Sequence, residues 1–389
     1  MKFGADGRLL IATRGLRGFI DGLVAVTLAA HLAALHNDAT RIGFIVTGML
    51  LGSAAMTLYV GVRASHVARR TLLLAGAVLM IATGIAFTLA SSFPFILAIG
   101  IIGTINPTSG DVSVVQPIEQ SLLPNAVSLA QRGPLFARYT FVGTACAAAG
   151  LLAAAIPDKL GISLRVSFAT YALVGVLILY LYSRLSPAIE PRSSVPPRPL
   201  GPSRLIVTRL AALFGLDSFA GGFAAQSLLA LWLFRRFDFT LTHAGMVLSM
   251  TGILAAASGF VAVRLERRIG PVRTMVFTHL PAQFFLIGAA FMPNATLAVA
   301  CLLARSALAS MDVPVRNAFV MSVVTEGERA AAASVTNVPR SLAAALSPFV
   351  AGWMLDQTTF GYPLIAAGVL KIVYDLLLLY MFDEVKTVA

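Results

Sequence analysis

Charged residues are scarce in this chain. Asp, Glu, Lys and Arg together make up 12% of the 389 residues, whereas hydrophobic residues make up 58% and the mean hydropathy is +0.85. A soluble globular domain carries about 25% charged residues, because its surface must be solvated. The composition therefore excludes an ordinary soluble protein and predicts a protein embedded in a lipid bilayer.

Cysteine is nearly absent, and so are the sequence signatures of catalysis. Cys146 and Cys301 lie in apolar runs, without the CxxC or Cys/His spacing that holds zinc. No Walker A sequence is present, which argues against an ATP-driven pump, and no Ser/His/Asp or Cys/His set is assembled. We therefore expect no metal site, no cofactor and no enzymatic activity.

Acidic residues are outnumbered by basic ones, with 17 Asp and Glu against 29 Lys and Arg. The resulting net charge of +12 is not distributed like a nucleic-acid surface, because the basic residues form short clusters between apolar runs. The positive-inside rule gives this pattern to the cytoplasmic loops of membrane proteins. We expect a multi-pass protein of the inner (cytoplasmic) cell membrane with both termini in the cytoplasm, and no nucleic-acid partner.

The chain contains enough apolar runs for twelve transmembrane helices. A helix needs about 20 mainly apolar residues, at about 1.5 Å each, to cross a bilayer. We predict spans at residues 9–35, 42–62, 71–90, 93–123, 134–157, 162–185, 205–234, 244–263, 272–292, 295–324, 335–355 and 363–382. The intervening segment 186–204 is rich in proline and arginine and cannot hold a helix. The predicted fold is thus an all-α membrane protein with an N-terminal six-helix bundle (1–185), a cytoplasmic linker (186–204) and a C-terminal six-helix bundle (205–389).

The two predicted bundles carry charged residues at matching places. Asp111 and Asp312 are 312 − 111 = 201 residues apart, and Asp21 and Asp217 are 217 − 21 = 196 residues apart. Both members of each pair lie in apolar spans at the same position in their own half. Two six-span halves related by an internal repeat are typical of one class of secondary transporters.

Four aspartates are expected near the middle of the bilayer. Each lies about twelve residues from the cytoplasmic end of its span, which corresponds to a depth of roughly 18 Å. A carboxyl group at that depth must be neutral or paired, so an aspartate there is a functional-site hypothesis by default. The predicted substrate and proton-coupling residues are Asp21, Asp111, Asp217 and Asp312.

A layer of arginines is expected on the cytoplasmic side of these aspartates. Most of them lie four or five residues inside the ends of their spans, roughly 6–8 Å deep. The predicted cytoplasmic gate or anion-binding layer consists of Arg14, Arg17, Glu119, Arg138, Arg209, Arg316 and Arg340. Two other interpretations remain open, namely structural ion pairs between helices and arginines that extend to the cytoplasmic interface.

Two acid and base pairs have the spacing of neighbours on one helix face. Asp312 and Arg316 are four residues apart and can pair directly. Lys371 and Asp375 have the same spacing, and we interpret them as a structural bridge. Arg305 lies nearer the outer side of its span and either pairs with an acid or lines an outer gate.

Other polar and proline residues within the spans give weaker indications. Asn106-Pro107, Pro314 and Pro348 interrupt helical hydrogen bonding and mark hinges or helix contacts. His279, close to Pro281, is expected to be an ordinary hydrogen-bonded residue.

The chain resembles the major facilitator superfamily over essentially its whole length. The resemblance rests on the repeat of six spans and on a basic turn after the second and eighth spans, where the family motif is approximately GxxxDRxGRR. The first turn reads GVRASHVARR, with Ser65 in place of the aspartate, and the second reads VRLERRIG, with Arg267 in place of it. The gating ion pair that the family builds on this aspartate lacks its acid here, and Glu119 or Glu266 is the expected substitute.

The resemblance implies alternating access around a central cavity lined chiefly by the first, fourth, seventh and tenth spans, which carry the four aspartates. We predict a monomeric, proton-coupled secondary transporter that moves a small organic solute, with efflux by antiport favoured over uptake. One alternative is an importer or exchanger of a small organic anion, phosphate or carboxylate, bound by the cavity arginines. A second is a non-transporting membrane sensor on the same fold.

Overall fold

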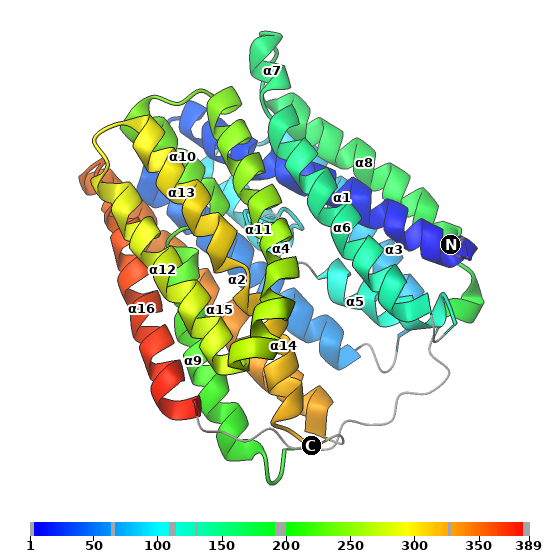
Figure 1. The fold of residues 1–389 in the computed structure, drawn as a ribbon. Helices are drawn as coiled ribbons and strands as arrows, with labels where there is room; N and C mark the ends of the chain where they lie inside the picture. Colours follow the sequence, from blue (N-terminus) through cyan, green and yellow to red (C-terminus); the bar gives the residue numbers. More distant parts are fainter. Residues whose placement is uncertain are drawn as a thin grey trace.

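The computed structural model of the chain describes residues 4–63, 67–108, 114–128, 131–190, 200–325 and 328–383, and all regular structure in these residues is helical (Figure 1). The helices are α1 (Ala5–Ala34), α2 (Ala39–Arg63), α3 (Arg69–Leu89), α4 (Phe93–Ile102), α5 (Val115–Leu122), α6 (Arg132–Ala153), α7 (Ile156–Lys159), α8 (Arg165–Ser183), α9 (Arg204–Gly222), α10 (Gln226–Phe237), α11 (Leu241–Ile269), α12 (Pro271–Phe291), α13 (Ala295–Ala309), α14 (Asp312–Ser322), α15 (Arg329–Gln357) and α16 (Tyr362–Phe382). Short 3₁₀ turns lie at Leu123–Asn125 and Pro187–Ile189. The predicted all-α fold is confirmed.

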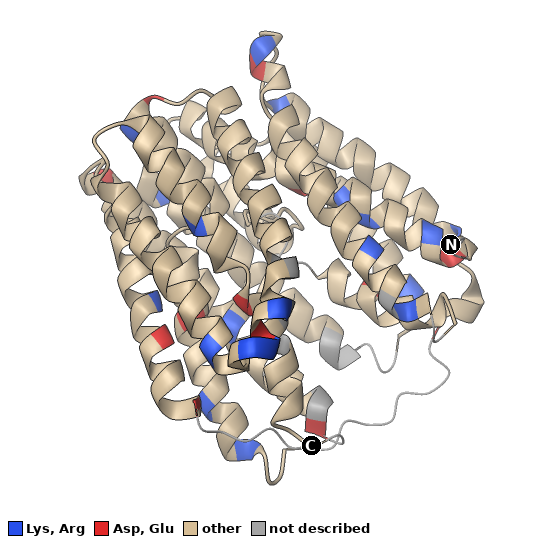
Figure 2. Ribbon diagram, in the orientation of Figure 1, with Lys and Arg blue, Asp and Glu red and all other residues tan. Residues whose placement is uncertain are grey.

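Twelve membrane crossings account for these helices. Within the described residues, nine segments are long and apolar enough to cross a membrane, one of them formed by α9 with α10. The other three predicted spans correspond to the pair α4 and α5, the pair α13 and α14, and α15, which has 29 residues. Figure 2 shows long stretches of helix without charge and many of the charged residues in the lower part of the view, where the C-terminus lies.

Three spans predicted as continuous helices are interrupted, so that prediction was wrong for 93–123, 205–234 and 295–324. The backbone leaves the helix at 103–108 between α4 and α5, at 223–225 between α9 and α10, and at 310–311 between α13 and α14. Irregular backbone at membrane depth is tolerated only where protein or a water-filled cavity surrounds it. The breaks in the fourth, seventh and tenth spans are therefore expected to face protein or a water-filled cavity and not lipid.

Local chemistry explains one of these interruptions, and a close helix contact lies at the start of a second. Pro107 cannot donate a helical hydrogen bond, and the Asn106 Oδ1 accepts hydrogen bonds from the Thr108 backbone N–H at 2.9 Å and hydroxyl at 2.7 Å, which closes a turn instead. After α9, a Cβ on Gly222 would lie 2.4 Å from the carbonyl oxygen of Ala344, so this helix end needs glycine. The two breaks meet, because the Ser227 N–H donates to the Pro107 carbonyl at 3.3 Å.

Helices α2 and α15, from opposite halves of the chain, cross at very close range. A Cβ on Gly43 would lie 2.3 Å from the Pro348 carbonyl oxygen, and one on Gly352 would lie 2.2 Å from the Ala39 carbonyl oxygen. The Thr47 hydroxyl oxygen accepts a hydrogen bond from the Phe349 N–H at 3.0 Å. Pro348 remains inside α15 and lies at this helix contact. Small residues let membrane helices approach in this way.

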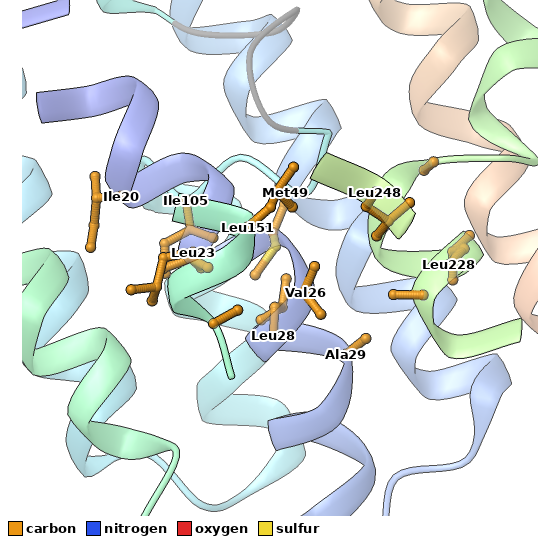
Figure 3. Packing of buried hydrophobic residues seen from close by; sticks show 14 of the residues in the cluster. Ile20, Leu23, Val26, Leu28, Ala29, Met49, Ile105, Leu151, Leu228 and Leu248 are labelled. Atoms are coloured by element: carbon orange, nitrogen blue, oxygen red, sulfur yellow. The ribbon is translucent and has the colours of Figure 1, made fainter. Parts of the chain in front are cut away.

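The apolar core joins the two halves at one end of the molecule. Figure 3 shows part of one buried cluster, in which side chains of α1, α2 and α6 lie near side chains of α10 and α11 from the other half; the labelled residues are Ile20, Leu23, Val26, Leu28, Ala29, Met49, Ile105, Leu151, Leu228 and Leu248. A second cluster, which includes Val207, Phe214, Phe319 and Leu378, contains only residues beyond position 200 in the described chain. The halves therefore share a core near the C-terminal end of α1, whereas the end that holds α14 and the start of α9 has a core of its own.

The ends of the predicted linker are fixed by carboxylates. Glu190 accepts hydrogen bonds from the backbone N–H groups of Arg69 at 3.1 Å and Arg70 at 2.8 Å, at the start of α3. At the other end, Glu328 accepts hydrogen bonds from the Gly201 N–H and, at 2.6 Å, from the Ser203 hydroxyl. Residues 191–199 and the motif residue Ser65 lie outside the described residues. Each end of the linker is thus attached to its own half.

Candidate functional site

Glu119 is the centre of a buried polar cluster in the N-terminal half (residues 1–185). It lies on α5 with no exposed surface, and side chains from α1, α6 and α8 surround it. Arg17 forms an ion pair with its carboxylate, the Tyr139 hydroxyl donates at 2.5 Å, and the Tyr182 hydroxyl donates at 2.6 Å. The Thr13 hydroxyl lies 2.6 Å from the same carboxylate. Four helices therefore converge on one acid, which was predicted to belong to a gate.

The two other arginines predicted in this half occupy different environments. Arg14 is half-buried, with its guanidinium 5.6 Å from the centre of the Tyr139 ring. Gly143 leaves room for it, since a Cβ there would lie 2.2 Å from the Arg14 Nε. Arg138 is exposed on α6. The structure places Arg14 and Arg17 on the same cluster and leaves Arg138 outside it.

Asp21 is a buried carboxylate on α1 without a hydrogen bond or ion pair among the described residues. Its residue exposure is 9%, and it makes no hydrogen bond or ion pair with any residue that the structure describes. Arg17 is one helical turn away, but its ion pair is with Glu119. Asp111, the other aspartate predicted in this half, lies outside the described residues.

A buried charge network forms in the C-terminal half (residues 205–389). Asp217 on α9 accepts hydrogen bonds from Lys371 Nζ at 2.5 Å and from Arg316 Nη1 at 3.2 Å. Arg316 Nη1 also donates to Asp312 at 3.2 Å, which confirms the predicted pair within α14. All four side chains are less than a tenth exposed. We name these residues, Asp217, Asp312, Arg316 and Lys371, the C-terminal charge network.

The predicted bridge between Lys371 and Asp375 is wrong. Lys371 contacts Asp217 on α9, and Asp375 lies 2.9 Å from the Nδ1 of His279 on α12. Helix α16 packs between α9 and α12, so two residues one turn apart each find a better partner across a helix interface. Neither Lys371 nor His279 has a counterpart in the internal repeat, and no residue spacing indicates their partners.

A small cavity adjoins the charge network. It has a volume of about 30 Å³, which is room for a water molecule. Its lining residues are Phe214, Arg316, Val320, Met321, Ala333, Thr336, Asn337 and Arg340. Arg340 Nε donates to the Ser218 hydroxyl and Arg340 Nη1 to the Asn337 side-chain oxygen, both at 3.2 Å. Arg209 is exposed on α9, so of the arginines predicted for this half only Arg316 and Arg340 reach the site.

The charge network joins α9, α14 and α16 through Asp217. Ionised carboxylates hold Lys371 and Arg316 inside a membrane-spanning region, where an unpaired charge is costly. If Asp217 gains a proton, its attraction to both cations falls, and the contacts among α9, α14 and α16 weaken together. Two of these three helices begin or end at a break in a span.

Comparisons with known proteins agree with this architecture. The sequence model of the Major Facilitator Superfamily matches residues 10–338 and again residues 212–388. The two matches start 212 − 10 = 202 residues apart, close to the spacing between Asp111 and Asp312. An uncharacterized membrane protein of Saccharomyces cerevisiae, YJR124C, is 22% identical over 421 residues, which cover 97% of this chain and 94% of that protein.

Solved transporter structures share the fold. A mutant of the nucleoside transporter NupG superposes with a TM-score of 0.76 at 14% identity, covering 97% of this chain and 99% of NupG. A bacterial homolog of the human lysosomal transporter Spinster, in an inward-facing and occupied conformation, also gives 0.76 at 15% identity, covering 97% of each chain. The chain belongs to the Major Facilitator Superfamily and has the fold of its transporters.

Proposed function

We propose that the protein is a proton-coupled secondary transporter that moves a small organic solute across the inner membrane by alternating access. The observation that carries the proposal is the position of Asp217, whose carboxylate is shared by Lys371 and Arg316 beside interrupted spans. A carboxylate that holds two cations in this way links its own protonation to the packing of three helices.

Asp21 provides a second place for a proton. Because it makes no hydrogen bond or ion pair with the described residues, it can be protonated without the loss of an ion pair. Asp21 and Asp217 also occupy equivalent positions in the sequence repeat. We assign Asp21 to proton or solute binding and the C-terminal charge network to the coupling of that event to movement of the helices.

The joining of the halves at one end supports alternating access. The shared core and the crossing of α2 and α15 close the end near the C-terminus of α1. If both termini are cytoplasmic, as the distribution of arginines predicts, that end faces outward and the site communicates with the cytoplasm. A solute would then load from the cytoplasm for efflux, while the proton enters from outside.

Proton flux in proteoliposomes tests the proposal. Purified protein is reconstituted with a pH-sensitive dye inside, and organic anions, neutral nucleosides and sugars, and organic cations are added one at a time under a pH gradient. We expect at least one solute to drive proton movement, and Asp21→Asn to reduce that movement about tenfold, because it removes a titratable group. Asp158→Asn, an exposed aspartate on α7, is the matched control. Equal proton flux and equal pH dependence in both variants would contradict the role of Asp21.

A further inference from the structure

Arg305 is a cation within a membrane-spanning segment. The proposed proton coupling does not involve it. It lies on α13, ten residues after Ala295, which places it about 15 Å along an otherwise apolar helix. Its side chain is half-buried, and its Nε is enclosed with no hydrogen-bond partner. No hydrogen bond or ion pair joins Arg305 to any residue in the described part of the chain.

The carboxylate whose charge acts on Arg305 already pairs with two other cations. The charge of Asp217 acts on Arg305, but the two Asp217 oxygens are held by Lys371 at 2.5 Å and by Arg316 at 3.2 Å. Asp312 forms an ion pair with Arg316 as well. Arg316 and Lys371 therefore hold both oxygens of Asp217, and Arg305 has no carboxylate within ion-pair distance among the described residues.

Arg305 cannot reach water by extending its side chain along the helix. An arginine side chain extends about 6 Å, whereas the middle of a hydrocarbon core is about 15 Å from either surface. Placing an unpaired guanidinium at such a depth costs several kcal/mol of free energy. Arginines are therefore found there where an anion or a water-filled cavity compensates the charge. We therefore expect an anionic group from outside the described part of the chain to contact Arg305.

We propose that Arg305 binds an anionic group of the transported solute, a carboxylate or a phosphate. The inference rests on the proposed transport function and narrows its substrate class. The planar guanidinium presents paired N–H donors that match two oxygens of either group, while Arg316 and Lys371 stay paired with Asp217. The solute anion would supply the negatively charged partner that Arg305 lacks among the described residues.

Ligand-dependent thermal unfolding of the purified protein tests binding without requiring transport. The probes are inorganic phosphate, benzoate and glycerol 3-phosphate, with uridine and choline as neutral and cationic comparisons. We expect at least one anion to stabilise the wild type, and Arg305→Gln to weaken its apparent affinity roughly 10-fold to 100-fold, as for a charge-assisted hydrogen-bonded contact. Arg305→Lys should retain part of the affinity. Whether the phosphates or the carboxylate raise the melting temperature more identifies the class of anion.

The unliganded variant separates recognition from a structural role. Removal of an unpaired buried charge should leave the melting temperature of ligand-free Arg305→Gln equal to or above that of the wild type. A lower melting temperature, or no anion that distinguishes the wild type from Arg305→Gln, overturns the inference. If neutral or cationic solutes drive proton flux equally in the two proteins, the anion assignment fails while proton coupling stands. If no solute drives proton flux but an anion still requires Arg305, the coupling proposal fails while the anion site stands.

Discussion

Asp21 and Asp217 show how residues at equivalent positions of a repeat acquire different environments. Asp217 is held by Lys371 and Arg316, whereas Asp21 has no ion pair in the described chain. In the N-terminal half the arginine one turn before the aspartate binds Glu119 instead. Repeated sequence therefore conserves the position of a carboxylate, and the partners that each half supplies determine whether that carboxylate is fixed or available.

Glu328, in the loop before α15, should make stability depend on pH. Hydrogen bonds from Ser203, then Thr325 and the Gly201 N–H, lower the pKa of Glu328 from 4.5 to about 2. Because the folded-state pKa is depressed, the ionised carboxylate contributes stability above about pH 4.5, and this contribution is lost as the pH falls toward 2. We expect the melting temperature of the wild type to decline more steeply than that of Glu328→Gln between about pH 6 and pH 3.

The matched control is Glu266→Gln on α11, because the Glu266 side chain makes no hydrogen bond with the described residues. Its melting curve against pH should follow that of the wild type. Parallel curves for wild type and Glu328→Gln would show that the contacts with Gly201, Ser203 and Thr325 do not hold the ionised form.

At the level of single residues, sequence predicts contacts within a helix better than contacts between helices. Asp312 and Arg316 were recognisable because spacing of four residues is a property of the helix itself. Glu119 was predicted at a gate, but its partners Tyr139 and Tyr182 come from helices whose mutual orientation no periodicity reveals. Lys371 was assigned to its neighbour on α16 for the same reason, since the competing acid on α9 is visible only after the helices pack.

At the level of elements, sequence predicts where the interrupted spans lie but not where each of them breaks. Their positions and total lengths follow from hydropathy, and Asn106-Pro107 marks one break. The break after α13 begins at Ser310 and Met311, which carry no breaking signal, and Pro314 lies in the first turn of α14, where proline is tolerated. Tertiary contacts therefore decide where such a helix stops, and a local pattern cannot supply them.

Asp356 should stabilise the closed end of the molecule. Its carboxylate accepts hydrogen bonds from the N–H groups of Ala39 at 2.9 Å and Thr40 at 2.6 Å, and it pairs with Arg235 at 2.9 Å. One side chain at the end of α15 thus caps α2 in the other half of the chain. We expect Asp356→Asn to favour the form in which this end opens by about tenfold, because charge-assisted hydrogen bonds are worth about 1.5–3 kcal/mol.

Labelling of a buried cysteine measures this opening. Leu228 on α10 is 1% exposed within the shared core, so Leu228→Cys in a cysteine-free background should react with a maleimide only when the halves separate. The control is Asp383→Asn, which breaks the pair with Arg273 inside one half. Equal labelling rates in the two variants would show that Asp356 does not hold the halves together.

For the whole molecule, composition and the internal repeat predict the fold, and the match of one family model at starts 202 residues apart agrees with the repeat. The halves are not copies in their chemistry, however. The N-terminal half compensates one buried acid with Arg17 and two tyrosines. The C-terminal half carries several paired charges and Arg305, which has no hydrogen-bond or ion-pair partner among the described residues. This asymmetry supports the proposal that proton binding, coupling and solute recognition depend on different groups of residues.

The most direct test of the central claim is to compare solute exchange with proton-driven accumulation in Asp217→Asn. Exchange of labelled for unlabelled solute needs no net proton movement, so it should continue in the variant, whereas accumulation under a pH gradient should fall at least about tenfold, because coupling through Asp217 is lost. Asp217→Asn with Lys371→Gln removes the cation left unpaired and should behave in the same way. Accumulation at the wild-type rate with unchanged pH dependence would contradict the claim that this network couples protons to transport.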